Sequence, residues 1–324
     1  MSDGLSFQNT PIVIDGRGWQ SDDTYNGVYM VGARDKDAYF SPDNPKDECI
    51  KPNWRYLFKL SRIWCPWQFW CEIIAYRLGS IIGVDVPPTH IGLSKTYEKG
   101  VDTYAALIEW FYDDKDKGYV PGGQLMESHI KDFDRLKGEK HNFETIRGMF
   151  KDSEDWLKYW AEVLTFDVLI GNTDRHQDNW GLIVKRTKKG NKMLIDINMS
   201  PAFDNGTALC YEILEQDIDK YEDTNRLGRY LTGRHAKHHM KWSLDEEGQL
   251  DFYEFMKKFT IAFPQMRSII GQHLSFTYQQ VEEVLAPLVE AVSDPKYKLT
   301  RKRLDFVLKL IFSRKRILKE TLEL

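Results

Sequence analysis

The sequence of 324 residues contains few cysteines, and their spacing is not that of a metal site. Cysteine occurs four times, without a CxxC pair and without a paired histidine nearby, at positions 49, 65, 71 and 210. This pattern argues against a disulfide framework and against a structural zinc site. We therefore expect free thiols and a reducing compartment.

Long apolar runs are also missing from the sequence. No stretch approaches the roughly 18 consecutive apolar residues that a membrane-spanning helix needs. The first residues, MSDGLSFQNTP, lack the basic and apolar regions of a secretory signal. We therefore expect a cytoplasmic protein without a membrane segment. Export by a route that needs no hydrophobic signal stays open as an alternative.

Charge of one sign is not in excess, since the formal net charge is only −4. Nucleic acid is therefore not an expected partner of the chain by itself. Internal repeats and low-complexity tracts are absent as well. Hydrophobic residues make up 42% and charged residues 29%, which is typical of a globular protein. At this length the chain is long enough for two packed lobes.

The N-terminal third favours strands with one helix among them. Short β-branched or aromatic runs alternate with Gly, Asp, Asn and Pro, and they predict strands at 11–15, 27–32, 37–40 and 54–60. Apolar residues recur at helical spacing over 67–82, where Gly83 closes the helix. Two further strands are expected at 89–94 and 104–112. Together these elements form a small mixed lobe.

The remainder of the chain reads as mainly helical. Residues 117–150 look rich in loops with weak helical stretches, whereas 154–170 forms a strong amphipathic pattern. Residues 180–198 predict two strands joined by a basic turn at Gly190. From residue 246 to the end helical periodicity dominates. We therefore divide the chain into an N-lobe, 1–112, and a helical C-lobe, 113–324.

The stretch IGNTDRHQDNWGLI, residues 170–183, carries the strongest chemical signal. Asn179 follows Asp174 by five residues, and Asp204 comes after the predicted hairpin. In phosphoryl transfer one carboxylate orients or deprotonates the acceptor hydroxyl, while an asparagine and a later carboxylate hold Mg²⁺ against the nucleotide phosphates. The alternative is a polar turn between a helix and a strand. Since a turn does not require Asp204, we interpret the set as the centre of a kinase.

Residues upstream are candidates for holding a nucleotide. Gly32 lies within VGARDK, where a glycine lets backbone N–H groups approach phosphates. We assign Gly32 and Ala33 to this phosphate loop, with Arg34 and Lys36 adding positive charge. A simple turn is the alternative for this glycine.

Two charged residues complete the expected order of kinase elements. Lys59 lies in a predicted strand, and Glu72 lies on the following helix, where it would fix the lysine ammonium. Solvated surface charges are the alternative reading of both residues. Glu109, in LIEWFY, would lie with Phe111 at a hinge that receives the adenine, or else at a strand edge. His176 would orient Asp174, or else pack in the loop as a structural histidine.

Two other segments have a weaker chemical interpretation. GRHAKHH, residues 233–239, has several histidines without a carboxylate or thiolate at metal-ligand spacing, so a solvated basic loop is expected. The run from Lys296 to Lys319 has apolar residues at helical spacing among Lys and Arg. It predicts a surface helix with one buried face, and nucleic-acid or partner binding stays open as the alternative.

These motifs resemble those of the HipA-like serine/threonine kinases, most closely the compact single-chain members. The resemblance is strongest in LIGNTDRHQDNWGLI and SPAFDNG, and extends to VGARDK, FKL with Glu72, GVDVPPTHI and ALIEWFY. It implies that Asp174 is the catalytic aspartate, that Asn179 and Asp204 bind Mg²⁺, and that Lys59 binds ATP phosphates. Larger members have an additional N-terminal subdomain, which is not expected here. Tyr29 stands where the toxin members have a serine that is autophosphorylated.

We therefore expect an α+β, two-lobed protein-kinase-like fold with a small β-rich N-lobe and a larger, mostly helical C-lobe. The cofactors implied are ATP and Mg²⁺, and the expected partners are a protein substrate and, by resemblance to bacterial toxins, an antitoxin. Phosphatidylinositol kinases share the D-R-H-x-x-N signature, so a lipid or small-molecule acceptor stays open. So does a pseudokinase-like binding module.

Overall fold

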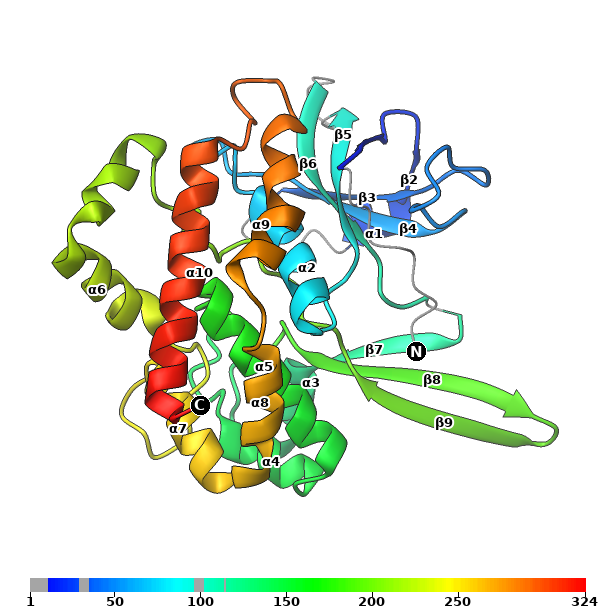
Figure 1. The fold of residues 1–324 in the computed structure, drawn as a ribbon. Coiled ribbons are helices and arrows are strands. Elements are labelled where there is room, and N and C mark those ends of the chain that lie inside the picture. Colours follow the sequence, from blue (N-terminus) through cyan, green and yellow to red (C-terminus); the bar gives the residue numbers. More distant parts are fainter. Residues whose placement is uncertain (1–10, 29–34, 96–101, 114) are drawn as a thin grey trace.

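The computed structural model describes residues 11–28, 35–95, 102–113 and 115–324. A curled six-stranded sheet in the N-terminal part precedes a mainly helical remainder (Figure 1). The strands lie in the order β1-β5-β6-β4-β3-β2, and all neighbours are antiparallel except β1 and β5. Their bounds are β1, Val13–Asp15; β2, Gln20–Ser21; β3, Lys36–Phe40; β4, Arg55–Lys59; β5, Thr89–Lys95; and β6, Asp102–Glu109.

The two faces of this sheet have different roles. On one face Phe58 of β4 packs with Ile14 and Leu107 in a small apolar core. Because side chains alternate along a strand, the neighbouring Lys59 points to the opposite face. Helix α2, Trp70–Ile82, covers that face, and it ends at Gly83, whose φ of 77° is the left-handed conformation that favours glycine. The sheet therefore directs Lys59 toward α2.

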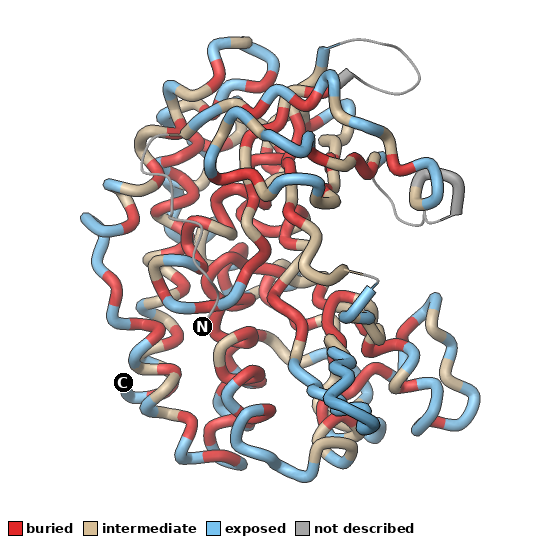
Figure 2. The backbone as a smooth tube through the Cα atoms, turned by 90° about the vertical axis from the view of Figure 1, so that its right-hand side faces the viewer, coloured by how far each residue is buried: buried red, intermediate tan, exposed pale blue. Residues whose placement is uncertain are grey.

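The helical remainder packs around α5, Glu154–Ile170, which is buried along most of its length. The long helix α10, Arg301–Leu322, runs beside it (Figure 1). Figure 2 shows buried segments throughout the interior of this part and exposed segments at its periphery. The other helices are α3, Gly122–His129; α4, Phe143–Phe150; α6, Thr224–Thr232; α7, Phe252–Ala262; α8, Arg267–His273; and α9, Tyr278–Leu285, with short 3₁₀ helices η1, Glu215–Glu222; η2, Arg234–Ala236; η3, Pro264–Met266; and η4, Ala286–Glu290.

A second sheet of three antiparallel strands lies below the first in Figure 1. It consists of β7, Lys117–Pro121; β8, Gly181–Lys189; and β9, Lys192–Met199. The outer part of the β8–β9 ribbon extends away from the body, and Ile195 is 63% exposed. The base of the ribbon joins the two segments that carry Asn179 and Asp204. The ribbon thus returns the chain to the junction of the two lobes.

Most of the predicted elements are confirmed. Strands appear near 11–15, 37–40, 54–60, 89–94 and 104–112, helices cover 70–82 and 154–170, and the ribbon turns at Gly190. The strand predicted at 27–32 is wrong at its start. Residues 27 and 28 end helix α1, Asp23–Val28, whose first turn is held by a hydrogen bond from the Tyr25 N–H to Asp22 Oδ1 (3.1 Å). The remainder of that stretch lies outside the described residues.

The weak helical stretches and loops expected over 117–150 appear as α3 and α4 with a loop between them, but strand β7 was not expected there. Strand β7 has little apolar character of its own. It is stabilised by pairing with β8, which lies some 60 residues later in the chain. No helix in the described ranges combines the length and apolar character needed to cross a membrane.

Candidate active site

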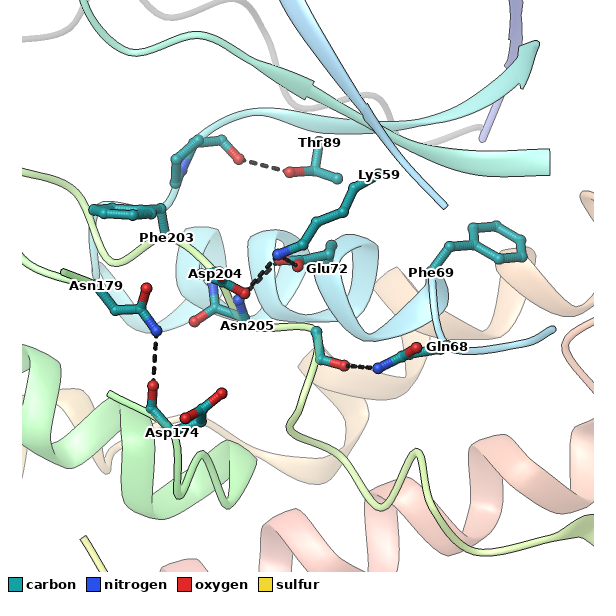
Figure 3. Close-up of polar contacts among 12 residues, drawn as sticks. Lys59, Gln68, Phe69, Glu72, Thr89, Asp174, Asn179, Phe203, Asp204 and Asn205 are labelled. Atoms are coloured by element: carbon teal, nitrogen blue, oxygen red, sulfur yellow. Dashed lines mark hydrogen bonds and ion pairs between the residues drawn. The ribbon is translucent and has the colours of Figure 1, made fainter. Parts of the chain in front are cut away.

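Three charged residues from three elements meet between the sheet and the helical part. The Lys59 Nζ lies 2.7 Å from Glu72 Oε1 and 2.5 Å from Asp204 Oδ1 (Figure 3). Lys59 and Glu72 are only 5% and 3% exposed, so the ion pair is largely shielded from water. Glu72 Oε2 also accepts a hydrogen bond from the Asn205 N–H (2.9 Å). The strand, the helix and the segment after β9 are therefore connected through ionic contacts.

A cavity opens beside this cluster. Lys36, Lys59, Glu72 and Asp204 lie at its polar side, and its other walls are mostly apolar or aromatic. Its remaining lining residues are Tyr25, Leu57, Val86, Pro87, Thr89, Ile108, Glu109, Trp110, Phe111, Tyr112, Tyr119, Phe203 and Asn205. An apolar slot with two lysines and two carboxylates at one end has the apolar walls that a planar base needs and two cations that can contact phosphates.

The segment after β6 forms the far wall of this cavity. The Glu109 side chain is turned to the protein interior, where its Oε1 accepts a hydrogen bond from Lys51 Nζ (2.6 Å). Burial raises the pKa of Glu109, and Lys51 opposes that rise. At Phe111, by contrast, no described group pairs with the backbone N–H or C=O. A ligand base therefore has a backbone donor and acceptor within this wall.

The loop after α5 brings the second group of polar residues to the cluster. Helix α5 ends at Gly171, which has a φ of 67°. Three residues later, the Asp174 carbonyl accepts a hydrogen bond from Asn179 Nδ2 (2.7 Å), which closes the loop (Figure 3). Across the described residues no donor contacts the Asp174 carboxylate. That carboxylate is available to a ligand.

Asp174 lines a different cavity, of about 330 Å³. This cavity is polar, and its remaining walls are Arg62, Gly171, Thr173, Thr207, Cys210, Tyr211, Glu212, Tyr230 and His235. We call it the acceptor cavity. Asp174 faces it, whereas Lys59 and Asp204 face the apolar slot. Among the described residues, the two cavities have no lining residue in common.

Arg175 connects the loop that contains Asp174 to helix α5 and to the segment around Asp204. It is 2% exposed, and its guanidinium pairs with Asp167 of α5, with Nη2 2.7 Å from Oδ1 and Nε 3.1 Å from Oδ2. Nη1 donates to the carbonyl of Phe203, and Nη2 donates to Asn205 Oδ1 (2.9 Å). Burial raises the pKa of Asp167, and the Arg175 charge opposes that rise. One side chain therefore fixes the loop relative to both α5 and Asp204.

The backbone at Asp204 is unusual. Its φ of 57° lies in the left-handed region, which L-residues other than Asn and Asp seldom occupy. Strain of this kind is often retained at functional sites. Here the neighbouring Asn205 is anchored by Glu72 and Arg175, so the surroundings impose the conformation. The carboxylate of Asp204 is directed toward Lys59 as a result.

His176 has a place within the loop. Its Nδ1 accepts a hydrogen bond from the Asp178 N–H (3.2 Å), and its ring centroid lies 5.9 Å from that of His239. The ring makes no hydrogen bond to the carboxylate of Asp174 in the described structure. These contacts are those of a histidine that packs within the loop. The sequence allowed this role as the alternative to orienting Asp174.

The predicted site residues thus fall into three groups. Lys36, Lys59, Glu72, Glu109, Phe111 and Asp204 line the slot, while Asp174, His176 and Asn179 belong to the loop beside it. Gly32, Ala33 and Arg34 lie outside the described residues. Where the chain is described, no three His, Cys, Asp or Glu side chains form a metal-binding group.

Sequence reasoning missed Arg175, Asp167 and Asn205. A signal existed for Asp167, because a carboxylate within the apolar pattern VLTFDVLI is unexpected on a buried helix. A buried carboxylate requires a partner. Arg175 is the arginine of the D-R-H-x-x-N signature, but that signature does not indicate which residues the arginine contacts.

Two other sequence expectations need correction. GRHAKHH was expected to be a solvated loop, but His238 is 1% exposed and packs on Phe252 and Phe255. Burial lowers its pKa to about 3. The C-terminal helix α10 is buried on more than one face, since Leu304, Phe306, Val307, Leu308, Leu310 and Ile311 are all buried.

The basic residues of α10 are largely neutralised within the chain. Lys302 pairs with Asp219 (2.7 Å), Arg303 with Glu215 (3.1 Å) and Lys309 with Glu222 (3.1 Å). Arg301 and Arg316 pair with acidic residues as well. These contacts favour the structural reading of this run over nucleic-acid binding.

Two solved structures are similar to this chain. The crystal structure of the proinflammatory kinase CtkA of Helicobacter pylori is similar over 96% of both chains, with a TM-score of 0.64 and 15% sequence identity. HipA in the toxin–antitoxin complex of HipA, HipB and operator DNA from Shewanella oneidensis MR-1 has a TM-score of 0.46 and 13% identity, over 92% of this chain and 67% of that one.

No curated protein matches the sequence significantly. The family model of the HipA-like C-terminal domain, however, matches residues 29–286. This match covers most of the chain, including every described residue of the slot other than Tyr25. The fold is kinase-like, and the chain belongs to the HipA-like family.

Proposed function

We propose that the protein is an ATP- and Mg²⁺-dependent protein kinase that transfers the γ-phosphate to Ser or Thr. The observation that carries this proposal is the contact of Lys59 with both Glu72 and Asp204 at the polar end of an apolar slot. In this proposal the N-lobe covers residues 1–112 and the C-lobe residues 113–324, with the nucleotide between them. Family membership supports it at the level of a protein kinase.

The adenine would lie in the slot against the segment after β6. Phe111 offers its backbone N–H and C=O, while Val86, Ile108 and Phe203 supply apolar contacts. Lys59 would then contact the phosphates, as the strand lysine does in protein kinases. Gly32, Ala33 and Arg34 are proposed from the sequence alone to cover the phosphates, together with Lys36.

Asn179 and Asp204 would hold Mg²⁺ through an amide oxygen and a carboxylate oxygen. Oxygen ligands of this kind fit Mg²⁺, which is often bound by one or two protein groups together with phosphates and water. Bound Mg²⁺ would neutralise charge on the nucleotide phosphates. The Asn179 Nδ2 already donates to the Asp174 carbonyl, which orients the amide oxygen away from that carbonyl. The loop thereby presents an acceptor atom.

Asp174 would accept the hydrogen bond of the acceptor hydroxyl from the acceptor cavity. Its carboxylate has no described donor, and the cavity is wide enough for a side chain. Because the transition state of phosphoryl transfer is loose, positioning and charge neutralisation supply most of the catalysis. His176 would act as a positioning residue within the loop rather than in contact with the substrate. Autophosphorylation and an antitoxin partner are further proposals from the family resemblance.

Labelled transfer tests the proposal. The protein would be incubated with γ-labelled ATP and a generic protein acceptor, with Mg²⁺ or with EDTA. We expect Mg²⁺-dependent label on Ser or Thr, identified by mass spectrometry. Label on phosphoinositide vesicles but not on protein would replace the protein acceptor with a lipid. Nucleotide binding without transfer to any acceptor would instead indicate a binding module.

A further inference from the structure

Four arginines in or beside the acceptor cavity form no ion pair in the described structure. Eight other described arginines form ion pairs, namely Arg17, Arg55, Arg135, Arg147, Arg175, Arg301, Arg303 and Arg316, whereas Arg186, Arg267 and Arg314 form none with a described carboxylate. Arg62, Arg226, Arg229 and Arg234 form none with any described carboxylate. All four line two adjoining pockets. Four arginines without an ion-pair partner among the described carboxylates therefore line two pockets that share Tyr230 and His235.

Arg226, Arg229 and Arg234 line an open pocket of about 510 Å³ at helix α6, which protrudes at the left of Figure 1. We call it the arginine pocket. Arg226 and Arg229 are three residues apart, so their side chains lie on neighbouring parts of one helix face. The remaining walls are Tyr221, Tyr230, Thr232, Gly233 and His235, with no Asp or Glu among them.

Acidic residues do exist near this pocket along the chain, but their contacts lie elsewhere. The Asp223 carboxylate caps α6 by accepting a hydrogen bond from the Arg226 backbone N–H (2.8 Å). Asp219 and Glu222 pair with lysines of α10. The guanidinium of Arg226 rests over the ring of Tyr221, 5.0 Å from its centroid. The positive charge of the arginine pocket is thus left without a counter-ion in the described structure.

The arginine pocket adjoins the acceptor cavity through a shared wall. Tyr230 and His235 line both spaces, and Asp174 lies in the second. The Tyr230 hydroxyl donates to Glu212 Oε1 (2.9 Å), which fixes the position of this wall. Behind Tyr230 lies Arg314, which is 1% exposed and whose Nε and Nη1 have no partner in the described parts. This buried guanidinium adds to the positive potential.

We propose that the arginine pocket binds an anionic side chain of the protein acceptor, a few residues from the hydroxyl that is phosphorylated. The chemical class is a phosphoserine or phosphothreonine, or a carboxylate in the same place. Guanidinium groups bind both anions through paired N–H donors. This inference rests on the proposed protein-kinase function and gives that function a substrate class.

Direct binding tests the site without requiring catalysis. Three fluorescent peptides would share one sequence and differ at one residue, which is phosphoserine, glutamate or serine. We expect the phosphoserine or glutamate peptide to bind at least about ten-fold more tightly than the serine peptide, and less tightly as salt rises. Tighter binding of the phosphoserine peptide than of the glutamate peptide would show that the pocket prefers a phosphate to a carboxylate. Equal binding of all three peptides would overturn the proposal.

Substitutions in the arginine pocket test whether the anionic peptide binds there. Arg229→Gln with Arg234→Gln should remove the preference for the anionic peptide, while Arg316→Gln, an exposed arginine paired with Glu320, should retain it. Both changes are at exposed positions, and thermal unfolding would verify the fold. Retention of the preference in the double variant would contradict the proposal. So would an RNA oligonucleotide that binds more tightly than the phosphopeptide and loses its affinity in the double variant.

Kinetics then separate this inference from the proposed function. In the wild type, kcat/KM should be at least about ten-fold higher for the phosphoserine peptide than for the serine peptide, mainly through KM. The double variant should bring this ratio close to one. If the wild type transfers phosphate but has equal kcat/KM for the two peptides, the proposed anion site is wrong and the kinase function stands. Selective binding without any transfer would overturn the kinase function alone.

Discussion

The Lys59 ammonium lies 2.5 Å from Oδ1 of Asp204, although the two residues are 145 positions apart in the chain. Lys59 comes from the N-terminal sheet, and Asp204 follows the β8–β9 ribbon of the helical part. Glu72 contacts the same ammonium from α2. The contact therefore spans the junction at which the nucleotide is proposed to bind.

Removing the lysine charge should affect stability and activity in separable ways. Lys59→Met leaves the Glu72 carboxylate buried without its cation, which should lower the free energy of unfolding by about 3–5 kcal/mol. Adding Glu72→Gln should recover a large part of this loss, since no buried charge then lacks its partner. Neither variant should transfer phosphate at an appreciable rate. Urea unfolding and labelled-ATP assays would be measured on both, and turnover in the double variant would contradict the role of Lys59.

Arg175 should not tolerate replacement by lysine. Its guanidinium contacts Asp167, Asn205 and the Phe203 carbonyl, and a single ammonium cannot reproduce that geometry. We expect Arg175→Lys to lower the free energy of unfolding by about 2–4 kcal/mol, since a buried network loses hydrogen bonds.

Arg135→Lys is the matched control for this change. Arg135 pairs with Asp178 of the same loop, but both side chains are about one-third exposed. The control should therefore change stability by less than about 1 kcal/mol. Equal effects of the two changes in urea unfolding would show that Arg175 is not the anchor of the loop.

Two glycines should respond to alanine with opposite signs. At Gly171 the φ is 67° and an added Cβ would lie 2.3 Å from Nη2 of the buried Arg314, so Gly171→Ala should cost about 2 kcal/mol or more. At Gly228, inside α6, an added Cβ meets nothing within 4 Å. Gly228→Ala should stabilise by about 0.5–1 kcal/mol. Thermal unfolding of both variants would test the predicted signs.

Acid should destabilise the protein partly through His238. Burial lowers the pKa of His238 to about 3, whereas in the unfolded chain it titrates near 6.5. Above that value both states are neutral and the group has no effect. As the pH falls from 6.5 toward 3, only the unfolded chain binds the proton, so stability is lost by up to about 1.4 kcal/mol per pH unit.

His238→Leu removes this titration while keeping an apolar contact with Phe252 and Phe255. Urea unfolding at a series of pH values should therefore show a shallower loss of stability below pH 6.5 in the variant. His141 is also buried and keeps its own contribution in both proteins. Parallel curves for the two proteins would contradict the assignment to His238.

The sequence identified the residues of the charged cluster but not the residues that hold the loop and Asp204 in position. Lys59, Glu72 and Asp204 were identified because strand, helix and loop follow one another in a recognisable order. Arg175 was missed because its role depends on Asp167 and Phe203, which reach it only through the tertiary fold. Strand β7 was missed for a similar reason, since it pairs with a strand much later in the chain. Non-local contacts of this kind leave little trace in local patterns.

Burial of polar residues was also hard to predict. The histidines of GRHAKHH look alike in the sequence, yet His238 is buried while His235 is half-exposed. The difference arises from helix α7, whose Phe252 and Phe255 cover His238. Polarity alone therefore predicted a solvated loop where packing places one histidine in the core.

The most direct test of the account is phosphate transfer by Asp174→Asn beside the wild type and Asp178→Asn. Asp178 lies in the same loop, but its carboxylate pairs with Arg135 instead of facing the acceptor cavity. With γ-labelled ATP, Mg²⁺ and a protein acceptor, we predict that Asp174→Asn lowers kcat by orders of magnitude while retaining ATP binding. Asp178→Asn should stay close to the wild type. Near-normal transfer by Asp174→Asn would contradict the account.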